Sequence, residues 1–226
     1  MKIENIKYHL VANHKIAYKL NSEEILNENS VIFDCGAYVG KFTEEIFRLI
    51  NPNINMFLYE PNIILYKKLV DKFENKENVN IFNKAISNKV GFNNLYLGKN
   101  LNESSLKKSK KGLTNDYLNV ETTTIPNEII KLNLKYIDVI KLNVEGEELD
   151  IINNLDKGVL EKIGQFAVAF HLNNGIKDYT QEIHDNTIKY MINNGFTSSN
   201  YYKNKHKLFF NEKWYNTDKY KELRYG

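Results

Sequence analysis

The feature that most constrains the fold of this chain is a repeated alternation of short apolar runs with longer segments of helical periodicity. Val31–Cys35 is an apolar run followed by a glycine, which is typical of a strand buried on both faces. The segment 41–50 then carries apolar residues on one helical stripe. A second run, 55–60, is followed by Pro61, which opens a helix extending to about residue 74. This repeated unit predicts a largely parallel sheet with helices on both faces.

The remaining segments continue the same pattern after one interruption. Two extended segments, 92–97 and 118–124, flank a polar loop at 100–115. We expect further strands at 78–86, 137–143 and 165–171, and helices at 126–133, from about 147 to 155, and at 178–194. A terminal antiparallel hairpin is predicted from 195–202 and 206–211, joined by a short turn.

Composition sets the broad class of the protein. The 226 residues fit one domain, which we divide into an N-terminal helical extension or lid at 1–30, a core at 31–211 and a tail at 212–226. A net charge of +3 is too small to argue for nucleic acid by itself. The only cysteine, Cys35, excludes an intrachain disulfide. No apolar stretch is long enough for a signal peptide or a membrane span, so we expect a cytoplasmic protein.

The loop that follows the first buried run is the strongest indication of a ligand. In open α/β sheets, ligands bind beyond the carboxyl ends of the strands. Gly36 and Gly40 in this loop allow close approach of backbone, but their spacing differs from the glycine pattern of dinucleotide folds. Asp34 at the start of the loop suits a cationic ligand better than a phosphate. These features favour S-adenosylmethionine, which has an ammonium and a sulfonium but no phosphate.

Glu60 ends the second buried run, 20 residues after Gly40. A carboxylate at this place can accept hydrogen bonds from both hydroxyls of a ribose. Taken alone, Glu60 is explained equally well as an acidic residue at a strand end that binds no ligand. Together with the glycine loop it predicts a cofactor site.

Four sequence blocks are similar to the FkbM family of S-adenosylmethionine-dependent methyltransferases. They are VIFDCGAYVGKFT, FLYEPN, NKAIS and IDVIKLNVEGEELDII, within a resemblance that runs from about Val31 to Phe196. The Ser104-Ser105 pair and the run 122–124 also resemble family features. The resemblance implies a Rossmann-like class I methyltransferase fold, α/β, with a mostly parallel seven-stranded sheet whose last strand is antiparallel. It also implies methyl transfer to an oxygen of a sugar, glycan or related metabolite.

The cofactor-binding residues that we predict are spread over the ends of several strands. They are Asp34, Gly36, Ala37, Tyr38, Gly40, Glu60, Pro61, Ala85 and Asn143. Two positions depart from the family pattern. Asn143 stands where the family usually has an aspartate, which removes a charged metal ligand or base, and Phe170 stands where an acidic residue often precedes the histidine. Without a clear carboxylate cluster, no metal site is predicted.

Three residues are candidates for catalysis. A hydroxyl becomes a good nucleophile when its proton leaves, so His171, at the end of a strand on the cofactor side, is the first candidate for a base. Glu145 could orient the acceptor or act as base, and Lys141 could stabilise a developing alkoxide. The alternative for Lys141 and Glu145 is a structural ion pair that fixes the turn after the fourth strand. His184 and His206 are interpreted as structural or exposed.

The acceptor is less constrained than the cofactor. The run KKSKK, 107–111, is interpreted as a solvated loop or as an attractor for an acidic acceptor. Tyr38 and Trp214 are candidates for lining a sugar site. A homo-oligomer is left open.

Two rival functions stay open at this stage. Methylation of RNA at the ribose 2′-oxygen could use a site with lysine and glutamate, although the modest charge argues against nucleic acid. A relative that binds the cofactor without turnover would explain Asn143. Base methylation is disfavoured because the fourth strand ends in LNVEG rather than an Asn-Pro-Pro-Tyr-like element.

Overall fold

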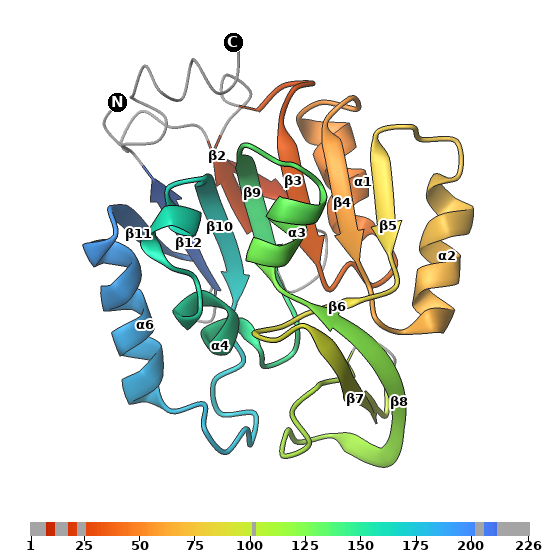
Figure 1. Cartoon of the computed structure of the whole chain (residues 1–226), viewed down its shortest axis with the longest axis vertical. Coiled ribbons are helices and arrows are strands. Elements are labelled where there is room, and N and C mark those ends of the chain that lie inside the picture. Colours follow the sequence, from red (N-terminus) through yellow and green to blue (C-terminus); the bar gives the residue numbers. More distant parts are fainter. Residues whose placement is uncertain (1–7, 12–17, 22–25, 101–102, 202–205, 212–226) are drawn as a thin grey trace.

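The computed structural model of the chain describes residues 8–11, 18–21, 26–100, 103–201 and 206–211. Its centre is a seven-stranded sheet in the order β11-β12-β10-β9-β3-β4-β5, shown face-on in Figure 1. The five strands β3, β4, β5, β9 and β10 are parallel, and β12 runs antiparallel to both of its neighbours. The predicted fold and C-terminal hairpin are confirmed.

Except at β5, the bounds of the central strands agree with the sequence patterns to within a few residues. They are β3 Val31–Cys35, β4 Asn55–Tyr59, β5 Val79–Phe82, β9 Ile137–Leu142, β10 Ile163–Ala169, β11 Phe196–Tyr201 and β12 His206–Asn211. Every residue of β3, β9 and β10 is buried, as expected for strands covered on both faces.

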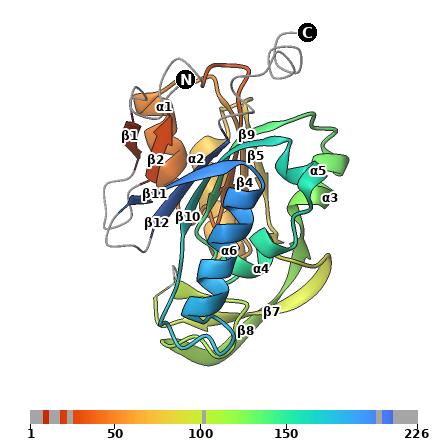
Figure 2. The same cartoon turned by 90° about the vertical axis from the view of Figure 1, so that its left-hand side faces the viewer.

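Helices cover the two faces of this sheet, as Figure 2 shows from the side. The helices α1 Lys41–Leu49 and α2 Ile63–Phe73 pack on one face through Phe42, Ile46, Leu69 and Phe73. The opposite face carries α3 Ile125–Lys131, α4 Glu148–Asn153, α5 Lys157–Leu160 and α6 Gln181–Asn193. Because successive residues of a strand point to opposite faces, neighbours such as Val139 and Ile140 of β9 enter different cores.

A second, three-stranded sheet lies beyond the carboxyl edge of the central sheet (Figure 1). It consists of β6 Ala85–Ile86, β7 Gly91–Gly98 and β8 Leu113–Thr123, in the order β6-β8-β7. The sequence predicted one continuous strand over 78–86, which is wrong. The chain leaves the central sheet at Asn83, whose side-chain Nδ2 donates to the carbonyl oxygens of Glu60 and Pro61 at 2.9 Å each.

The described part of the N-terminal region is a β-hairpin and not the predicted helix. Strands β1 Tyr8–Val11 and β2 Tyr18–Asn21 pair antiparallel. Their backbones lie beside α1 and against β10 and β12 (Figure 2). The predicted tail at 212–226, with Trp214, lies outside the described residues. Among the described residues, no helix has the length and apolarity to cross a membrane.

Candidate functional site

The loop between β3 and α1 is held in place by its backbone. The amide groups of Gly36 and Ala37 both donate to the carbonyl of Tyr59, at 3.0 and 3.1 Å. Gly36 has a φ of +77°, and a Cβ at this position would lie 2.1 Å from the carbonyl oxygen of Asn143. Only glycine therefore allows this loop to lie against the end of β9. Gly40 also has a φ of +77°, and a Cβ there would lie 2.6 Å from the Phe73 ring.

Asp34 does not face the ligand space as its sequence position suggested. The Asp34 side chain is fully buried, with Oδ1 2.9 Å from the Lys141 Nζ and Oδ2 accepting from the Thr43 hydroxyl at 3.1 Å. Lys141 Nζ also donates to the carbonyl oxygen of Gly36 at 2.7 Å. The structural alternative considered from the sequence paired Lys141 with Glu145, but Lys141 pairs with Asp34, and Glu145 pairs with Lys110 and His171. Lys141 instead ties β9 to β3 and to the glycine loop, an arrangement that favours a structural role.

Glu60 follows β4 and is anchored by two backbone amides. Its Oε2 accepts from Tyr38 N–H at 2.8 Å and its Oε1 from Asn62 N–H at 2.9 Å. Burial raises the pKa of Glu60 to about 7, although these two hydrogen bonds and the Lys141 charge oppose the shift. Each carboxylate oxygen keeps a further acceptor position for a ligand hydroxyl.

A cavity of about 320 Å³ joins these loops at the carboxyl edge of the sheet. It lies between the ends of β3 and β9, where neighbouring crossovers leave toward opposite faces, as expected for ligand sites in such sheets. Its walls come from the ends of the central strands, from α2 and from the second sheet. They are Gly36, Tyr38, Lys41, Tyr59, Glu60, Pro61, Leu65, Ala85, Ile86, Leu95, Ser104, Leu106, Asn143, Val144 and Glu145.

Six of the nine predicted cofactor residues line this cavity: Gly36, Tyr38, Glu60, Pro61, Ala85 and Asn143. The other three, Asp34, Ala37 and Gly40, support the loop from behind. Leu95 and Leu106 were missed because they belong to the second sheet and the loop beyond it. No periodicity in the sequence indicates that this sheet folds over the cofactor side.

Asn143 presents an unsatisfied polar atom beside the cavity. Its Oδ1 is buried and has no hydrogen-bond partner among the described residues. A buried carbonyl oxygen without a donor costs about 1–3 kcal/mol, so a ligand donor reaching it would be favoured. Asn143 thus fits a ligand with an N–H or O–H group.

Glu145 lines the cavity with a strained backbone, because its φ is +59°. Its Oε2 lies 3.1 Å from Nζ of Lys110 and its Oε1 lies 3.2 Å from Nε2 of His171. Burial alone would raise the pKa of Glu145, but His171 and Lys110 lower it below its ordinary value. Glu145 is therefore an anion at neutral pH.

His171 lies two residues beyond the end of β10 and is absent from the cavity wall. Its Nδ1 is 2.8 Å from Oε1 of Glu148, so the ring is held between two carboxylates. Burial opposes the charge on the ring, but Glu148 and Glu145 outweigh it and raise the pKa of His171 to about 10. A protonated imidazole with both nitrogens engaged cannot accept a proton, which argues against His171 as the base.

Glu148, the first residue of α4, was not recognised as a site residue from the sequence. It is fully buried and accepts hydrogen bonds from Val144 N–H, Gly146 N–H and the Tyr179 hydroxyl. These bonds, with His171, fix the turn between β9 and α4, which we call the β9–α4 turn (residues 143–147). The glutamate two residues after a glycine was the available signal, but its partners are distant in sequence.

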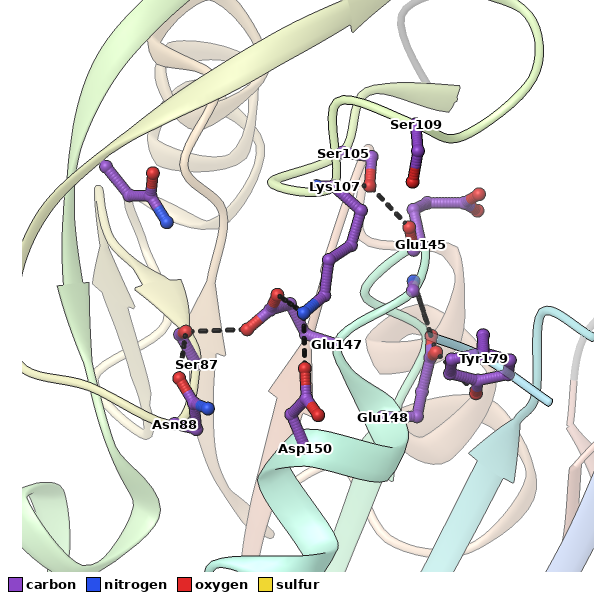
Figure 3. Close-up of polar contacts among 12 residues, drawn as sticks. Ser87, Asn88, Ser105, Lys107, Ser109, Glu145, Glu147, Glu148, Asp150 and Tyr179 are labelled. Atoms are coloured by element: carbon purple, nitrogen blue, oxygen red, sulfur yellow. Dashed lines mark hydrogen bonds and ion pairs between the residues drawn. The ribbon is translucent and has the colours of Figure 1, made fainter. Parts of the chain in front are cut away.

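Two lysines of the KKSKK run, Lys107 (Figure 3) and Lys110, are docked on carboxylates, while Lys108, Ser109 and Lys111 are exposed. We call residues 103–112 the lysine loop. Lys107 Nζ lies 3.1 Å from Glu147 Oε1 and also contacts Asp150, while Glu147 Oε2 accepts from the Ser87 hydroxyl at 2.7 Å. The Lys110 side chain is only 4% exposed. The interpretation as a free basic attractor is therefore wrong for Lys107 and Lys110.

The described residues contain no group of three or more His, Cys, Asp or Glu side chains suited to hold a metal ion. Cys35 is buried, and burial raises the pKa of its thiol, so it is a packing residue. His184 is likewise buried in α6, where its ring packs edge-on against Phe170.

The sheet order, the glycine loop and the anchored carboxylate have the arrangement expected of the cofactor domain of a Rossmann-like S-adenosylmethionine-dependent methyltransferase. Residues 34–198 match the family described as the Methyltransferase FkbM domain. The chain belongs to this FkbM family, and its cofactor is S-adenosylmethionine. No curated protein matches the chain.

Solved structures of methyltransferases are similar to this chain at low sequence identity. The methyltransferase FkbM from Methylobacillus flagellatus KT is 12% identical with a TM-score of 0.51, over 83% of this chain and 45% of that chain. This chain thus spans less than half the length of that relative. A putative rRNA-methylase from Clostridium thermocellum is 11% identical with a TM-score of 0.50, over 83% and 88% of the two chains. Aeropyrum pernix fibrillarin, solved with natively bound S-adenosyl-L-methionine, is 12% identical with a TM-score of 0.47, over 81% and 66%.

Proposed function

We propose that this protein is an O-methyltransferase that acts on a hydroxyl of a sugar, glycan or related metabolite. The observation that carries the proposal is the cavity that brings Glu60 and the β9–α4 turn around one space. The cofactor supplies a methyl group on a sulfonium. The protein must bind the acceptor so that its oxygen lies close to this methyl group, because positioning provides much of the acceleration in such displacements.

The residues present fit the cofactor. Glu60 would accept from the ribose hydroxyls while its own orientation is fixed by two backbone amides. The apolar side chains of Leu65, Leu95 and Leu106 would pack on the adenine. The unsatisfied Oδ1 of Asn143 would accept from a donor of the cofactor or the acceptor.

Glu145 is the residue that we assign to the acceptor. Apart from Glu60, it contributes the only carboxylate of the described cavity wall, and it is held as an anion by Lys110 and His171. A carboxylate of lowered pKa is a weak base, so we assign it the binding and orientation of a hydroxyl rather than complete proton removal. His171 acts in this proposal as a fixed cation that keeps Glu145 charged.

The ion pairs of Lys107 and Lys110 favour a neutral acceptor over an RNA backbone, and Lys41 is the lysine of the described cavity wall. Lys107 and Lys110 are engaged by carboxylates, so neither presents a free cation for a phosphate. RNA ribose 2′-O-methylation is the second candidate, because it also transfers a methyl group to a hydroxyl. The third candidate is a protein that binds the cofactor without turnover, and it rests on Asn143 in place of the family's usual aspartate. Cytoplasmic location and oligomeric state stay predictions from the sequence.

The test is transfer of a radioactive methyl group from S-adenosylmethionine to a panel of acceptors. The panel contains neutral monosaccharides and oligosaccharides, nucleotide-linked sugars and a structured RNA, with Glu60→Ala as the inactive control. Label in a neutral carbohydrate supports the proposal. Label only in the RNA overturns it in favour of the second candidate. Tight cofactor binding without label in any acceptor favours the third, and Asn143→Asp then tests whether the family's usual residue restores turnover.

A further inference from the structure

The lysine loop covers the cofactor cavity from the side of the second sheet. Ser104 and Leu106 of this loop form part of the cavity wall, opposite the ends of the central strands. The loop is folded back on β7 by a two-way backbone pairing, with Tyr96 N–H donating to Ser105 O and Ser105 N–H to Tyr96 O, at 2.8 and 2.9 Å. The start of the loop is thus attached to β7 of the second sheet by backbone hydrogen bonds.

The loop is also attached to the central domain by side chains. The Ser105 hydroxyl donates to the carbonyl oxygen of Glu145 at 2.6 Å, as Figure 3 shows. Lys107 reaches past it to Glu147 and Asp150, and the Lys107 side chain is 29% exposed. Farther along, Lys111 N–H donates to Asn174 O at 2.7 Å, in the segment between β10 and α6.

Lys110 differs from the other lysines of the loop because its ammonium is inside the protein. Its Nζ lies 3.1 Å from Glu145 Oε2 and donates to the carbonyl oxygen of Glu103 at 2.7 Å. It is therefore bonded at once to the loop and to a carboxylate residue of the cavity wall. Removing one partner of such a buried pair leaves an uncompensated charge.

We propose that the lysine loop is a lid over the cofactor cavity, and that Lys110 is the positioning residue that couples its closure to the orientation of Glu145. The ion pairs of Lys107 and Lys110 hold the lid on the β9–α4 turn. Leu106 lines the cavity, so separation of these pairs would widen the opening through which a cofactor enters or leaves. The proposal rests on the proposed function both for the cofactor and for the role of Glu145 at the acceptor.

The experiment compares Lys110→Met with wild type in two measurements on the full chain. The first is hydrogen–deuterium exchange of the peptide that covers residues 103–112. The second is the dissociation rate of S-adenosylhomocysteine in a stopped-flow displacement assay. We expect faster exchange confined to this peptide and a dissociation rate increased roughly tenfold, because a lid that opens more often releases the bound ligand faster.

Lys108→Met is the matched control. It removes the same charge from the same loop, but Lys108 Nζ packs over the Tyr96 ring at 5.7 Å from its centroid. It should leave both measurements near wild type. Lys110→Arg should restore slow exchange and slow dissociation, because a guanidinium can pair with Glu145 in the same place.

If Lys110→Met does not fold, Lys107→Met is tested in its place. We expect it to increase the dissociation rate of S-adenosylhomocysteine by about threefold, because Lys107 is more exposed. Equal exchange and dissociation in Lys110→Met, Lys108→Met and wild type would overturn the proposal. The exchange measurement needs no ligand, so it tests the tethering by itself. A wild-type protein that binds no S-adenosylhomocysteine would instead contradict the proposed function.

Discussion

The two sides of the cavity are built by different means. On the side of α1 and α2, Gly36, Tyr38 and Asn62 contribute backbone amides and close contacts over short sequence distances. On the side of the lysine loop, charged side chains from three separate segments meet, and Lys107, Glu145 and His171 are far apart in the chain. Backbone hydrogen bonds and close contacts fix the first side, and the balance of buried charges fixes the second. The two sides should therefore respond differently to substitution, pH and salt.

The largest expected effect is on the charged side. His171→Gln would leave Glu145 and Glu148 buried without their shared cation, and we expect it to lower the free energy of unfolding by about 3–5 kcal/mol. Because the pKa of His171 is raised to about 10, its stabilising contribution is complete below the unfolded-state pKa of 6.5 and is lost as the pH rises through about 10. Urea denaturation of the wild type and of His171→Gln at pH 6 and pH 10 measures the loss of stability and its pH dependence. If the difference in the free energy of unfolding between wild type and His171→Gln were the same at pH 6 and pH 10, the charge-balance interpretation would be contradicted.

Next in size is Gly36→Ala on the backbone side. The new Cβ would meet the Asn143 carbonyl in a left-handed conformation, and we expect a destabilisation of about 2–4 kcal/mol. Thermal unfolding followed by circular dichroism checks this. Gly158→Ala, in α5, is the matched control, because Gly158 has an ordinary φ and its Cβ would meet only a side-chain oxygen at 3.3 Å. Similar melting temperatures for the two variants would show that the loop can move away from β9.

Glu60→Ala tests the anchored carboxylate, with no large effect on stability expected. S-adenosylmethionine affinity should fall by about 1.5–3 kcal/mol, the range for hydrogen bonds to a charged group. Since the pKa of Glu60 is about 7 in the free protein, hydrogen bonds from ligand hydroxyls should favour its ionised form. Binding near pH 7 should therefore release a proton. Calorimetry in two buffers of different ionisation enthalpy measures it, and Glu60→Gln should show no release.

The smallest expected effect is for Thr43→Val, which removes one hydrogen bond to Asp34 but leaves its ion pair with Lys141. We expect a loss of about 1 kcal/mol in the free energy of unfolding. Denaturant titration is sufficient to detect it. A much larger loss would mean that the Asp34–Lys141 pair depends on Thr43, and the backbone side would then share the charge sensitivity of the other side.

The same difference explains what the sequence could predict. The central strands and the glycine loop follow from local patterns, because buried strands are continuous apolar runs and only glycine tolerates the conformation of Gly36. The second sheet was missed at β6, where Asn83 redirects the chain by hydrogen bonds to a distant loop. Asp34 was assigned to the ligand because nothing local indicates that Lys141 lies behind it.

The charged network could not be predicted for a related reason. Which carboxylate pairs with which lysine depends on how the second sheet docks, and residues such as Lys110 and Glu145 carry no local signal of their pairing. The strand–helix pattern predicted a turn after the fourth strand, and the structure has it between β9 and α4. This pattern did not indicate that His171 would be protonated, because that depends on two carboxylates converging on one ring.

The order of strands in the central sheet also has a consequence for synthesis on the ribosome. β12 is inserted between β10 and β11, although both of these precede it in the chain. Until residues 206–211 have emerged from the exit tunnel, β10 is an open edge and β11 has no neighbour to pair with. Nascent chains that stall before this point would expose an unpaired, apolar edge that includes Phe166 and Val168, the kind of surface that chaperones bind.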